Sequence, residues 1–179
     1  TEKSKTEQTI LRNVFTKGDA WFNTNDLVRD MGFGHTQFVD RLGDTFRWKG
    51  ENVSTQEVEG IINLIDNVEE SIVFGVEIPG CNGRAGMAKI ILKENKALDM
   101  DNLYRLLSNE LPAYAVPIFV RIAGDAAITS TFKHQKSALK KENFDINIIK
   151  DEVYVLKNKQ YVLLDRNFHE EISKGDIRF

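Results

Sequence analysis

The chain has 179 residues, of which 41% are hydrophobic and 28% charged, and its formal net charge is −3. This composition is ordinary for a globular protein, and the small negative charge gives no reason to expect nucleic-acid binding. The single cysteine, Cys81, excludes an internal disulfide and a cysteine-rich metal site. The sequence has no apolar run of about 18 residues and no signal peptide, so no membrane-spanning helix is expected. It starts at Thr1 rather than at methionine, which favours a piece of a longer product.

The first forty residues predict a helix followed by strands. Residues 6–15 carry apolar side chains at helical spacing, and Gly18 is a plausible end for that helix. Residues 20–23 are typical of a short strand. Residues 28–39 are interrupted by glycines and return through aromatic side chains, which indicates a β-hairpin.

The middle of the chain alternates helices and strands. Residues 54–57, Ser-Thr-Gln-Glu, form a capping box at the start of a helix whose inner face is apolar. Asp101 is expected to cap a second helix, whose leucines face the core. Strands are expected at 70–78, 87–92 and 118–122.

The last third continues this alternation. A helix is expected at 136–141, and 153–155 with 161–164 form a candidate hairpin. Asp165 begins a last helix that Gly175 ends. Strands alternating with helices predict an α+β fold with a small central sheet and flanking helices.

Three short stretches carry side chains suited to nucleotide chemistry. Asn23-Thr24-Asn25-Asp26 is a polar turn that ends in a carboxylate, an acceptor suited to hydroxyl groups. Residues 40–60 contain Arg47 and Lys49, which share one side of an extended segment if alternation holds. Residues 129–133, Thr-Ser-Thr-Phe-Lys, end in a lysine beside a basic stretch.

Each stretch also has a purely structural interpretation. Asp26 suits the capping of a neighbouring N–H group in a turn. In the second stretch, Phe46 and Trp48 can face inward while the cations remain solvated. Lys133 resembles many surface lysines. The three histidines have no metal-ligand spacing and suggest no catalytic triad, so no metal site is assigned; they are His35, His134 and His169.

Taken together, these stretches resemble the adenylate-forming enzymes and, among them, the fatty acid transport proteins, or very-long-chain acyl-CoA synthetases. The resemblance covers nearly the whole chain and includes Leu-Pro-Ala-Tyr-Ala-Val-Pro at 111–117. It implies three parts. The end of an N-terminal AMP-binding domain occupies 1–41, the hinged C-terminal domain 42–150, and a family-specific tail 151–179.

The same resemblance implies roles for individual residues. Asp26 would bind the ribose hydroxyls of ATP, and Arg41 the ribose and phosphate side of the adenylate. Gly43 and Asp44 would form the hinge about which the C-terminal domain rotates. Lys133 would be the catalytic lysine, next to the α-phosphate and the attacking carboxylate oxygen.

Two further points concern the second substrate and the nucleotide turn. Arg47, Lys49 and Gly50 would line the pantetheine tunnel and contact phosphates of CoA. The family usually has glycine where this chain has Asn25. Asparagine is the next most tolerant residue at positive φ, so the turn is compatible with the motif.

The implied reaction is ATP-dependent ligation of a long- or very-long-chain fatty acid to CoA through an acyl-adenylate, coupled to fatty acid uptake. Its cofactors and substrates are ATP, coenzyme A, Mg²⁺ and the fatty acid. Mg²⁺ would be bound mainly by a large N-terminal domain whose phosphate loop this sequence lacks. We therefore expect the chain alone to be inactive. The intact protein is expected to associate with the endoplasmic reticulum or plasma membrane through regions outside this chain, with this part facing the cytosol.

Two alternatives remain open from the sequence. Asn25 favours a truncated, non-catalytic interaction module or the end of a pseudoenzyme. A CoA ligase for another carboxylate, such as a bile acid, fits the same motifs, because acyl specificity would lie in the N-terminal domain. The oligomeric state is likewise open.

Overall fold

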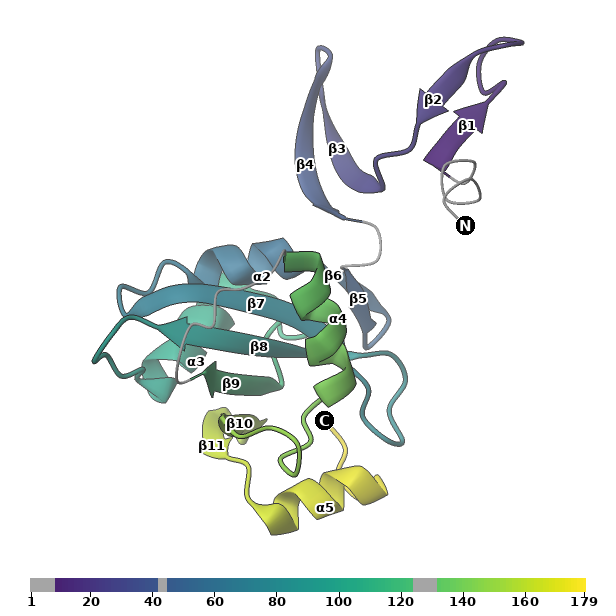
Figure 1. Cartoon of the computed structure of the whole chain (residues 1–179). Coiled ribbons are helices and arrows are strands. Elements are labelled where there is room, and N and C mark those ends of the chain that lie inside the picture. Colours follow the sequence, from purple (N-terminus) through teal and green to yellow (C-terminus); the bar gives the residue numbers. More distant parts are fainter. Residues whose placement is uncertain (1–8, 42–44, 124–131) are drawn as a thin grey trace. The chain divides into compact units, whose positions relative to one another are not determined.

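The computed structural model describes residues 9–41, 45–123 and 132–179, with the backbone alone at 39–41 and 132–135. Contacts between residues divide the chain into two compact units, residues 1–42 (unit 1) and residues 43–179 (unit 2). Residues 10–41 of unit 1 form two β-hairpins, and the described part of unit 2 contains the main sheet and helices α2 to α5 (Figure 1).

The first hairpin of unit 1 corrects a sequence prediction. The helix expected over residues 6–15 is wrong from Ile10 onward, because β1 (Ile10–Arg12) pairs antiparallel with β2 (Ala20–Phe22). Residues 6–8 lie outside the described residues. The helical spacing gave a wrong prediction because the Asp19 side chain stabilises a loop between β1 and β2. Its carboxylate accepts the N–H groups of residues 14, 15 and 16 at 2.8, 2.9 and 3.0 Å.

These hydrogen bonds also act on the charge of Asp19. The N–H of Thr16, followed by the indole N–H of Trp21, lowers the pKa of the Asp19 carboxyl far below its ordinary value. The ionised carboxylate therefore stabilises the loop, and its contribution is present above the ordinary pKa and lost in strong acid.

The second hairpin of unit 1 confirms the prediction. It pairs β3 (Asp26–Gly32) antiparallel with β4 (His35–Arg41). The two turn residues, Phe33 and Gly34, have φ of 53° and 76°. Positive φ at both central positions is typical of the type I′ turn, whose twist matches that of the flanking strands.

Unit 2 is built on a mixed five-stranded sheet with the order β11-β10-β9-β8-β7. Neighbouring strands are antiparallel except β8 and β9, which are parallel. The strands are β7 (Val68–Val76), β8 (Ala85–Leu92), β9 (Phe119–Ala123), β10 (Glu152–Lys157) and β11 (Gln160–Leu163). The tail residues after 151 thus supply two of the five strands, continuous with the domain that precedes them.

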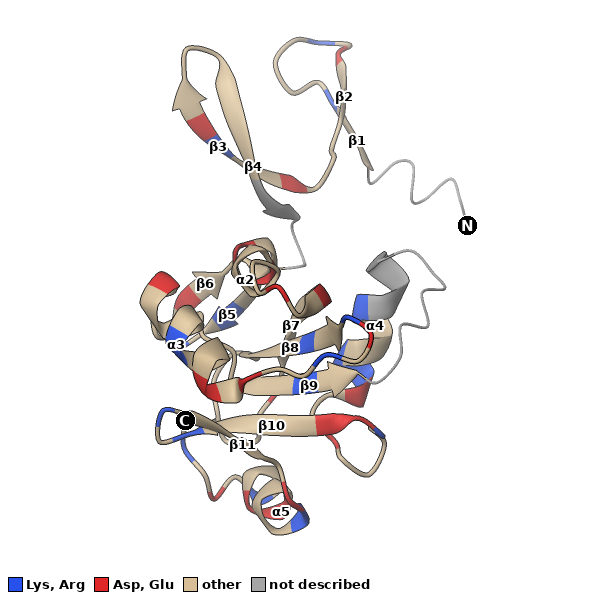
Figure 2. Cartoon of the chain, turned by 90° about the vertical axis from the view of Figure 1, so that its left-hand side faces the viewer, with Lys and Arg blue, Asp and Glu red and all other residues tan. Residues whose placement is uncertain are grey.

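Four helices of unit 2 surround this sheet: α2 (Thr55–Ile62), α3 (Met100–Glu110), α4 (Phe132–Glu142) and α5 (Arg166–Lys174). α3 lies on one face of the sheet and α4 on the opposite face, while α5 lies beyond β10 and β11 (Figures 1 and 2). The central sheet and flanking helices confirm the predicted α+β class.

Helix caps follow the sequence with one exception. Ser54 accepts the N–H of Glu57 at 3.3 Å, as the capping box predicts. Asp165 caps α5, and Gly175 ends it in the left-handed conformation with φ 79°. The prediction for α3 is wrong by two residues, because Asp99 rather than Asp101 is the N-cap. Its carboxylate accepts the N–H groups of Asp101 and Asn102, both at 3.0 Å.

A small hairpin of β5 (Phe46–Trp48) and β6 (Glu51–Val53) docks on the sheet through glycines. Gly75 and Gly86 are directly opposed on β7 and β8. A methyl group added to Gly75 would meet Phe46 Cβ at 2.6 Å, and one added to Gly86 would meet Phe46 Cζ at 3.1 Å. The phenyl ring therefore lies where two neighbouring strands have no side chains, which fixes the hairpin against the sheet.

The tail is fastened to the domain by Tyr161 on β11. Its buried hydroxyl donates to the carbonyl oxygen of Pro117 at 2.7 Å, and its ring meets Tyr104 of α3 edge to face at 6.3 Å. Burial raises the pKa of the Tyr161 phenol far above its ordinary value. The folded chain thus keeps this proton, and the associated stability is lost as pH rises above the ordinary tyrosine pKa.

Tyr161→Phe is expected to lower the free energy of unfolding by about 1–2 kcal/mol, because the Pro117 carbonyl loses its buried donor. Urea unfolding of the 179-residue chain measures this. Tyr154→Phe is the matched control: Tyr154 donates to Glu152 at 2.9 Å in an exposed position, so a change within about 0.5 kcal/mol is expected. Equal effects of the two substitutions would contradict the assigned role of Tyr161.

Candidate functional site

The polar turn before β3 has the backbone that its motif requires. Asn25 has φ 58°, the left-handed conformation that glycine adopts most readily. The Asn25 N–H donates to Asn23 Oδ1 at 3.0 Å, and the Asp26 N–H donates to Thr24 Oγ1 at 3.3 Å. The side chains of Asn23 and Thr24 thus hold the turn. Asn25 thus adopts the left-handed conformation that the sequence analysis expects asparagine to tolerate.

The β3–β4 hairpin brings two predicted nucleotide-binding residues together. Asp26 is the first residue of β3 and is paired in register with Arg41, the last residue of β4. The Asp26 side chain is partly buried. Both residues therefore lie at one end of one hairpin, although 14 positions separate them in the sequence. The Arg41 side chain lies outside the described residues.

The predicted CoA-contacting residues form the tip of the β5–β6 hairpin. β5 ends at Trp48, and Lys49 and Gly50 have φ of 51° and 87°, so they are the two central residues of a tight turn. The expectation that Arg47 and Lys49 share one side of an extended segment is therefore wrong, because Lys49 lies in the turn. Instead, the Lys49 ammonium lies 6.0 Å from the centre of the Trp48 ring.

The hairpin separates its apolar and charged side chains. Phe46 and Trp48 are 5% and 2% exposed, as the structural interpretation predicts, whereas Arg47, Lys49 and Gly50 are exposed. Arg47 Nε donates to the Gly50 carbonyl at 3.0 Å, which holds the guanidinium over the turn. The result is an exposed tip with two cations and an unobstructed glycine, able to contact a phosphate and a thin ligand chain.

Three predicted residues have less structural detail. Lys133 lies in the first turn of α4 (Phe132–Glu142), and its side chain lies outside the described residues. Gly43 and Asp44 also lie outside them. The boundary between the two compact units falls between Leu42 and Gly43.

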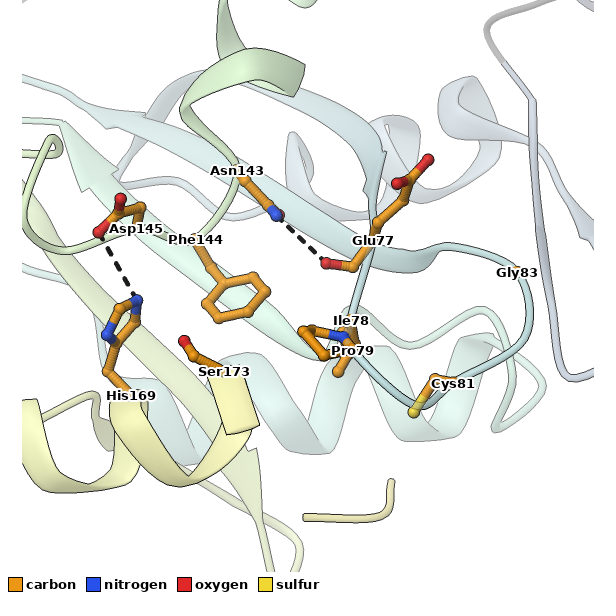
Figure 3. Close-up of a pocket in the computed structure, with 10 residues that line it drawn as sticks. All are labelled: Glu77, Ile78, Pro79, Cys81, Gly83, Asn143, Phe144, Asp145, His169 and Ser173. Atoms are coloured by element: carbon orange, nitrogen blue, oxygen red, sulfur yellow. Dashed lines mark hydrogen bonds and ion pairs between the residues drawn. The ribbon is translucent and has the colours of Figure 1, made fainter. Parts of the chain in front are cut away.

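A separate hollow of about 520 Å³ lies between the end of β7, the loop after α4, and α5. Figure 3 shows His169 directed at Asp145, with Nε2 3.7 Å from the carboxylate, and Asn143 donating to the Glu77 carbonyl at 3.2 Å. Of the described residues lining the hollow, none is a predicted site residue. Cys81 also lines it as a partly buried loop thiol. The polar groups named here hold segments of the chain together.

His169 shows what the sequence left out. It lies on α5, is only 8% exposed, and packs edge to face on Phe144 with the ring centres 5.7 Å apart. Within residues 9–41, 45–123 and 132–179, no three His, Cys, Asp or Glu side chains are grouped so that they hold a metal ion. In the same part of the chain, no helix has the length and apolar character needed to cross a membrane.

Comparison with known proteins bears on these residues. Residues 57–133 match the AMP-binding enzyme C-terminal domain. This chain contains an AMP-binding enzyme C-terminal domain. The match runs from the first turn of α2 to Lys133, so it includes the sheet strands β7, β8 and β9 and ends at the predicted catalytic lysine.

Relatives extend the match to the flanking segments. The chain is 45% identical over 177 residues to the medium/long-chain-fatty-acid–CoA ligase FadD6 of Mycobacterium tuberculosis, covering 98% of this chain and 30% of that protein. It is 45% identical over 178 residues to long-chain fatty acid transport protein 2 of Rattus norvegicus, covering 98% of this chain and 29% of that protein. The chain thus spans less than a third of the length of these relatives and corresponds to their C-terminal part.

A solved structure shows the same fold. The amide bond synthetase McbA of Marinactinospora thermotolerans superposes with a TM-score of 0.62 at 24% identity, covering 78% of this chain and 27% of that one. The predicted domain and its fold are therefore confirmed: unit 2 has the fold of the C-terminal domain of adenylate-forming enzymes.

Proposed function

We propose that this chain is the C-terminal part of an ATP-dependent ligase that joins long- or very-long-chain fatty acids to coenzyme A and so supports fatty acid uptake. The observation that carries the proposal is 45% identity over 98% of the chain to a protein named as a medium/long-chain-fatty-acid–CoA ligase. The Asp26–Arg41 pairing and the exposed β5–β6 tip support it, since both suit the roles that such an enzyme requires.

The first half-reaction forms an acyl-adenylate. A carboxylate oxygen of the fatty acid attacks the α-phosphorus of ATP. The bond from the α-phosphorus to the oxygen that bridges the α- and β-phosphates breaks, and pyrophosphate leaves. Asp26 accepts hydrogen bonds from the ribose hydroxyls, and Arg41 binds ribose and phosphate oxygens. Lys133 stabilises the negative charge that builds up between the carboxylate and the phosphate. We assign no residue of this chain to Mg²⁺, which the rest of the ligase would bind.

The second half-reaction forms the thioester. The sulfur of CoA attacks the acyl carbonyl, the thiol loses its proton, and AMP leaves. Arg47 and Lys49 contact phosphates of CoA, and Gly50 lets the pantetheine arm pass close to the backbone. The two steps need different side chains, so unit 2 rotates about Gly43 and Asp44 between them. The division of the chain into compact units after Leu42 supports this hinge.

The conformation of Asn25 favours an active nucleotide turn over the non-catalytic alternative. A positive φ of 58° gives Asn25 the backbone conformation that glycine adopts most readily. Unit 1 also exposes large apolar side chains, including Phe15, Phe22 and Phe33 at 76%, 71% and 103%. In the ligase these would pack against the remaining N-terminal domain, which would also bind the acyl chain and the membrane of the endoplasmic reticulum or cell surface.

The test is acyl-CoA synthesis by the complete ligase with a panel of fatty acids and a bile acid, beside the 179-residue chain alone. The complete enzyme is expected to form acyl-CoA from long-chain acids and to need ATP and CoA. The chain alone is expected to form no acyl-adenylate, because its sequence contains no Ser/Thr/Gly-rich phosphate loop and we assign acyl binding to the remaining N-terminal domain. A complete enzyme inactive on every acid, or preferring the bile acid, would overturn the proposed fatty acid activity.

A further inference from the structure

α4 is held against the rest of unit 2 by a lysine that points inward. Lys136 Nζ lies 3.0 Å from Glu59 Oε1 and 3.0 Å from Thr55 Oγ1, both on α2. The Lys136 and Glu59 side chains are only 11% and 18% exposed, and Thr55 is fully buried. We name these three residues the Lys136 clamp. A lysine is seldom this buried unless it is paired, so its placement is specific.

The clamp extends into the sheet. Glu59 Oε1 also accepts the backbone N–H of Val73 at 2.8 Å. β7 is an edge strand of the sheet, so this bond satisfies an edge N–H group that has no neighbouring strand. One carboxylate thereby ties α2, β7 and α4 together, across 77 sequence positions between Glu59 and Lys136.

The other end of α4 is fastened separately. Arg121 on β9 is 9% exposed and pairs with Glu142, the last residue of α4, and with Asp151 at 2.6 Å. With the C-terminal end held by Arg121, the Lys136 clamp determines the direction in which the N-terminal turn of the helix lies. Lys133 is in that turn, three residues before Lys136, or about 4.5 Å along the axis.

We propose that Lys136 is a positioning residue for adenylation, which orients the first turn of α4 and with it Lys133. This role rests on the proposed function. An ion pair this buried contributes little net stability, because desolvation of both charges offsets their attraction. It does, however, fix one geometry, and a misplacement of about 1 Å in a catalytic group costs roughly 100-fold in rate. The clamp therefore acts on rate rather than on folding.

The test uses variants of the complete ligase that remain folded. Lys136→Met alone leaves the Glu59 charge buried without its ammonium, so the main variant is Lys136→Met with Glu59→Gln. The new amide retains an oxygen for the Val73 N–H, and both charges are gone. Lys136→Arg keeps the cation. Lys141→Met, an exposed lysine of the same helix, is the matched control.

The double variant is expected to slow acyl-adenylate formation about 10- to 100-fold through kcat, with little change in KM for ATP. Thioester formation from preformed acyl-adenylate and the melting temperature should stay close to wild type. Lys136→Arg should recover part of the loss, and Lys141→Met should stay within about twofold of wild type. Equal losses in both half-reactions, or no loss in either, would overturn the positioning role.

Hydrogen exchange on the 179-residue chain separates this proposal from the proposed function. In the double variant, amides of residues 136–142 should exchange faster than in wild type, while those of α3 should not change. Unchanged exchange would overturn the clamp whatever the enzyme does. If the complete wild-type protein forms no acyl-adenylate, the proposed function and the adenylation role of Lys136 fail together, while faster exchange would still establish that Lys136 holds α4.

Discussion

Lys133→Ala in the complete ligase is expected to slow acyl-adenylate formation by about 10²–10³-fold, the usual cost of removing one group that stabilises transition-state charge. Charge accumulates between the attacking carboxylate and the α-phosphate, and an alanine provides no counter-charge there. Thioester formation from preformed acyl-adenylate should be nearly unchanged, because we assign that step to the β5–β6 tip. Pyrophosphate exchange measures the first step, and release of AMP from the preformed adenylate in the presence of CoA measures the second.

Lys174→Ala is the control for this experiment. Lys174 is 66% exposed on α5 and pairs with Glu170 at 3.5 Å, so its loss should change neither half-reaction by more than about twofold. Loss of both half-reactions in Lys133→Ala would mean that the lysine supports the fold, or that it contributes to both the adenylation and the thioester-forming conformations. An unchanged first half-reaction would remove Lys133 from the catalytic role altogether.

The sequence predicted unit 2 well because its local signals agree with its packing. Capping side chains begin α2 and α5, and Gly175 ends α5. The hairpin expected at residues 153–155 and 161–164 is present as β10 and β11. Local signals of this kind depend only on neighbouring residues, and the apolar faces they predict match the buried core.

Two errors came from side chains that act over a few residues. The Asp19 carboxylate accepts three backbone N–H groups and so stabilises a loop, and the segment predicted as a helix is a hairpin. Asp99 rather than Asp101 caps α3, because both aspartates precede the same leucines and only geometry separates them. Apolar spacing alone contains neither piece of information.

Among the site residues, the pairing of two strands in one hairpin was easier to predict than a contact between elements far apart in the sequence. The register that brings Asp26 opposite Arg41 follows from a hairpin that the glycines already indicated. The Lys136 clamp was not predictable, because Glu59 and Thr55 lie about 80 residues away and a lysine gives no sign in sequence that it points inward. Lys136 looked like part of a solvated basic face, and only the structure shows its acceptors.

Gly83→Ala is expected to be the most destabilising substitution among the glycines that the structure describes. Gly83 has φ 89°, and an added Cβ would lie 2.3 Å from the carbonyl oxygen of Arg47 and 3.6 Å from Trp48 Cα. The same carbonyl accepts the N–H of Arg84 at 2.7 Å, and Trp48 forms an antiparallel β-bridge with Gly83. The backbone therefore cannot move away from an added Cβ without breaking the contacts that attach the β5–β6 hairpin to this loop. We expect a loss of about 2–4 kcal/mol in the free energy of unfolding, from backbone strain together with the clash.

Two glycines separate the contributions to this loss. Gly80 also has positive φ, 76°, but its nearest atom is 3.7 Å away, so Gly80→Ala carries the conformational strain without the clash and should cost about 1 kcal/mol. Gly60 lies in α2 with nothing within 4 Å, so Gly60→Ala should stabilise by about 0.5–1 kcal/mol. Urea unfolding of the 179-residue chain gives all three values. Equal losses for Gly83→Ala and Gly80→Ala would show that the close approach to Arg47 contributes nothing.

The same substitution connects the fold to the proposed second half-reaction. Displacing the Arg47 carbonyl moves the turn that carries Lys49 and Gly50, whereas α4 and the Lys136 clamp are held by other contacts. A folded Gly83→Ala ligase, assayed below its melting temperature, should therefore lose thioester formation more than adenylation, by about tenfold or more. A uniform loss would indicate general destabilisation. Selective loss of adenylation would contradict the assignment of the β5–β6 tip to CoA, because the tip would then serve the first substrate rather than the second.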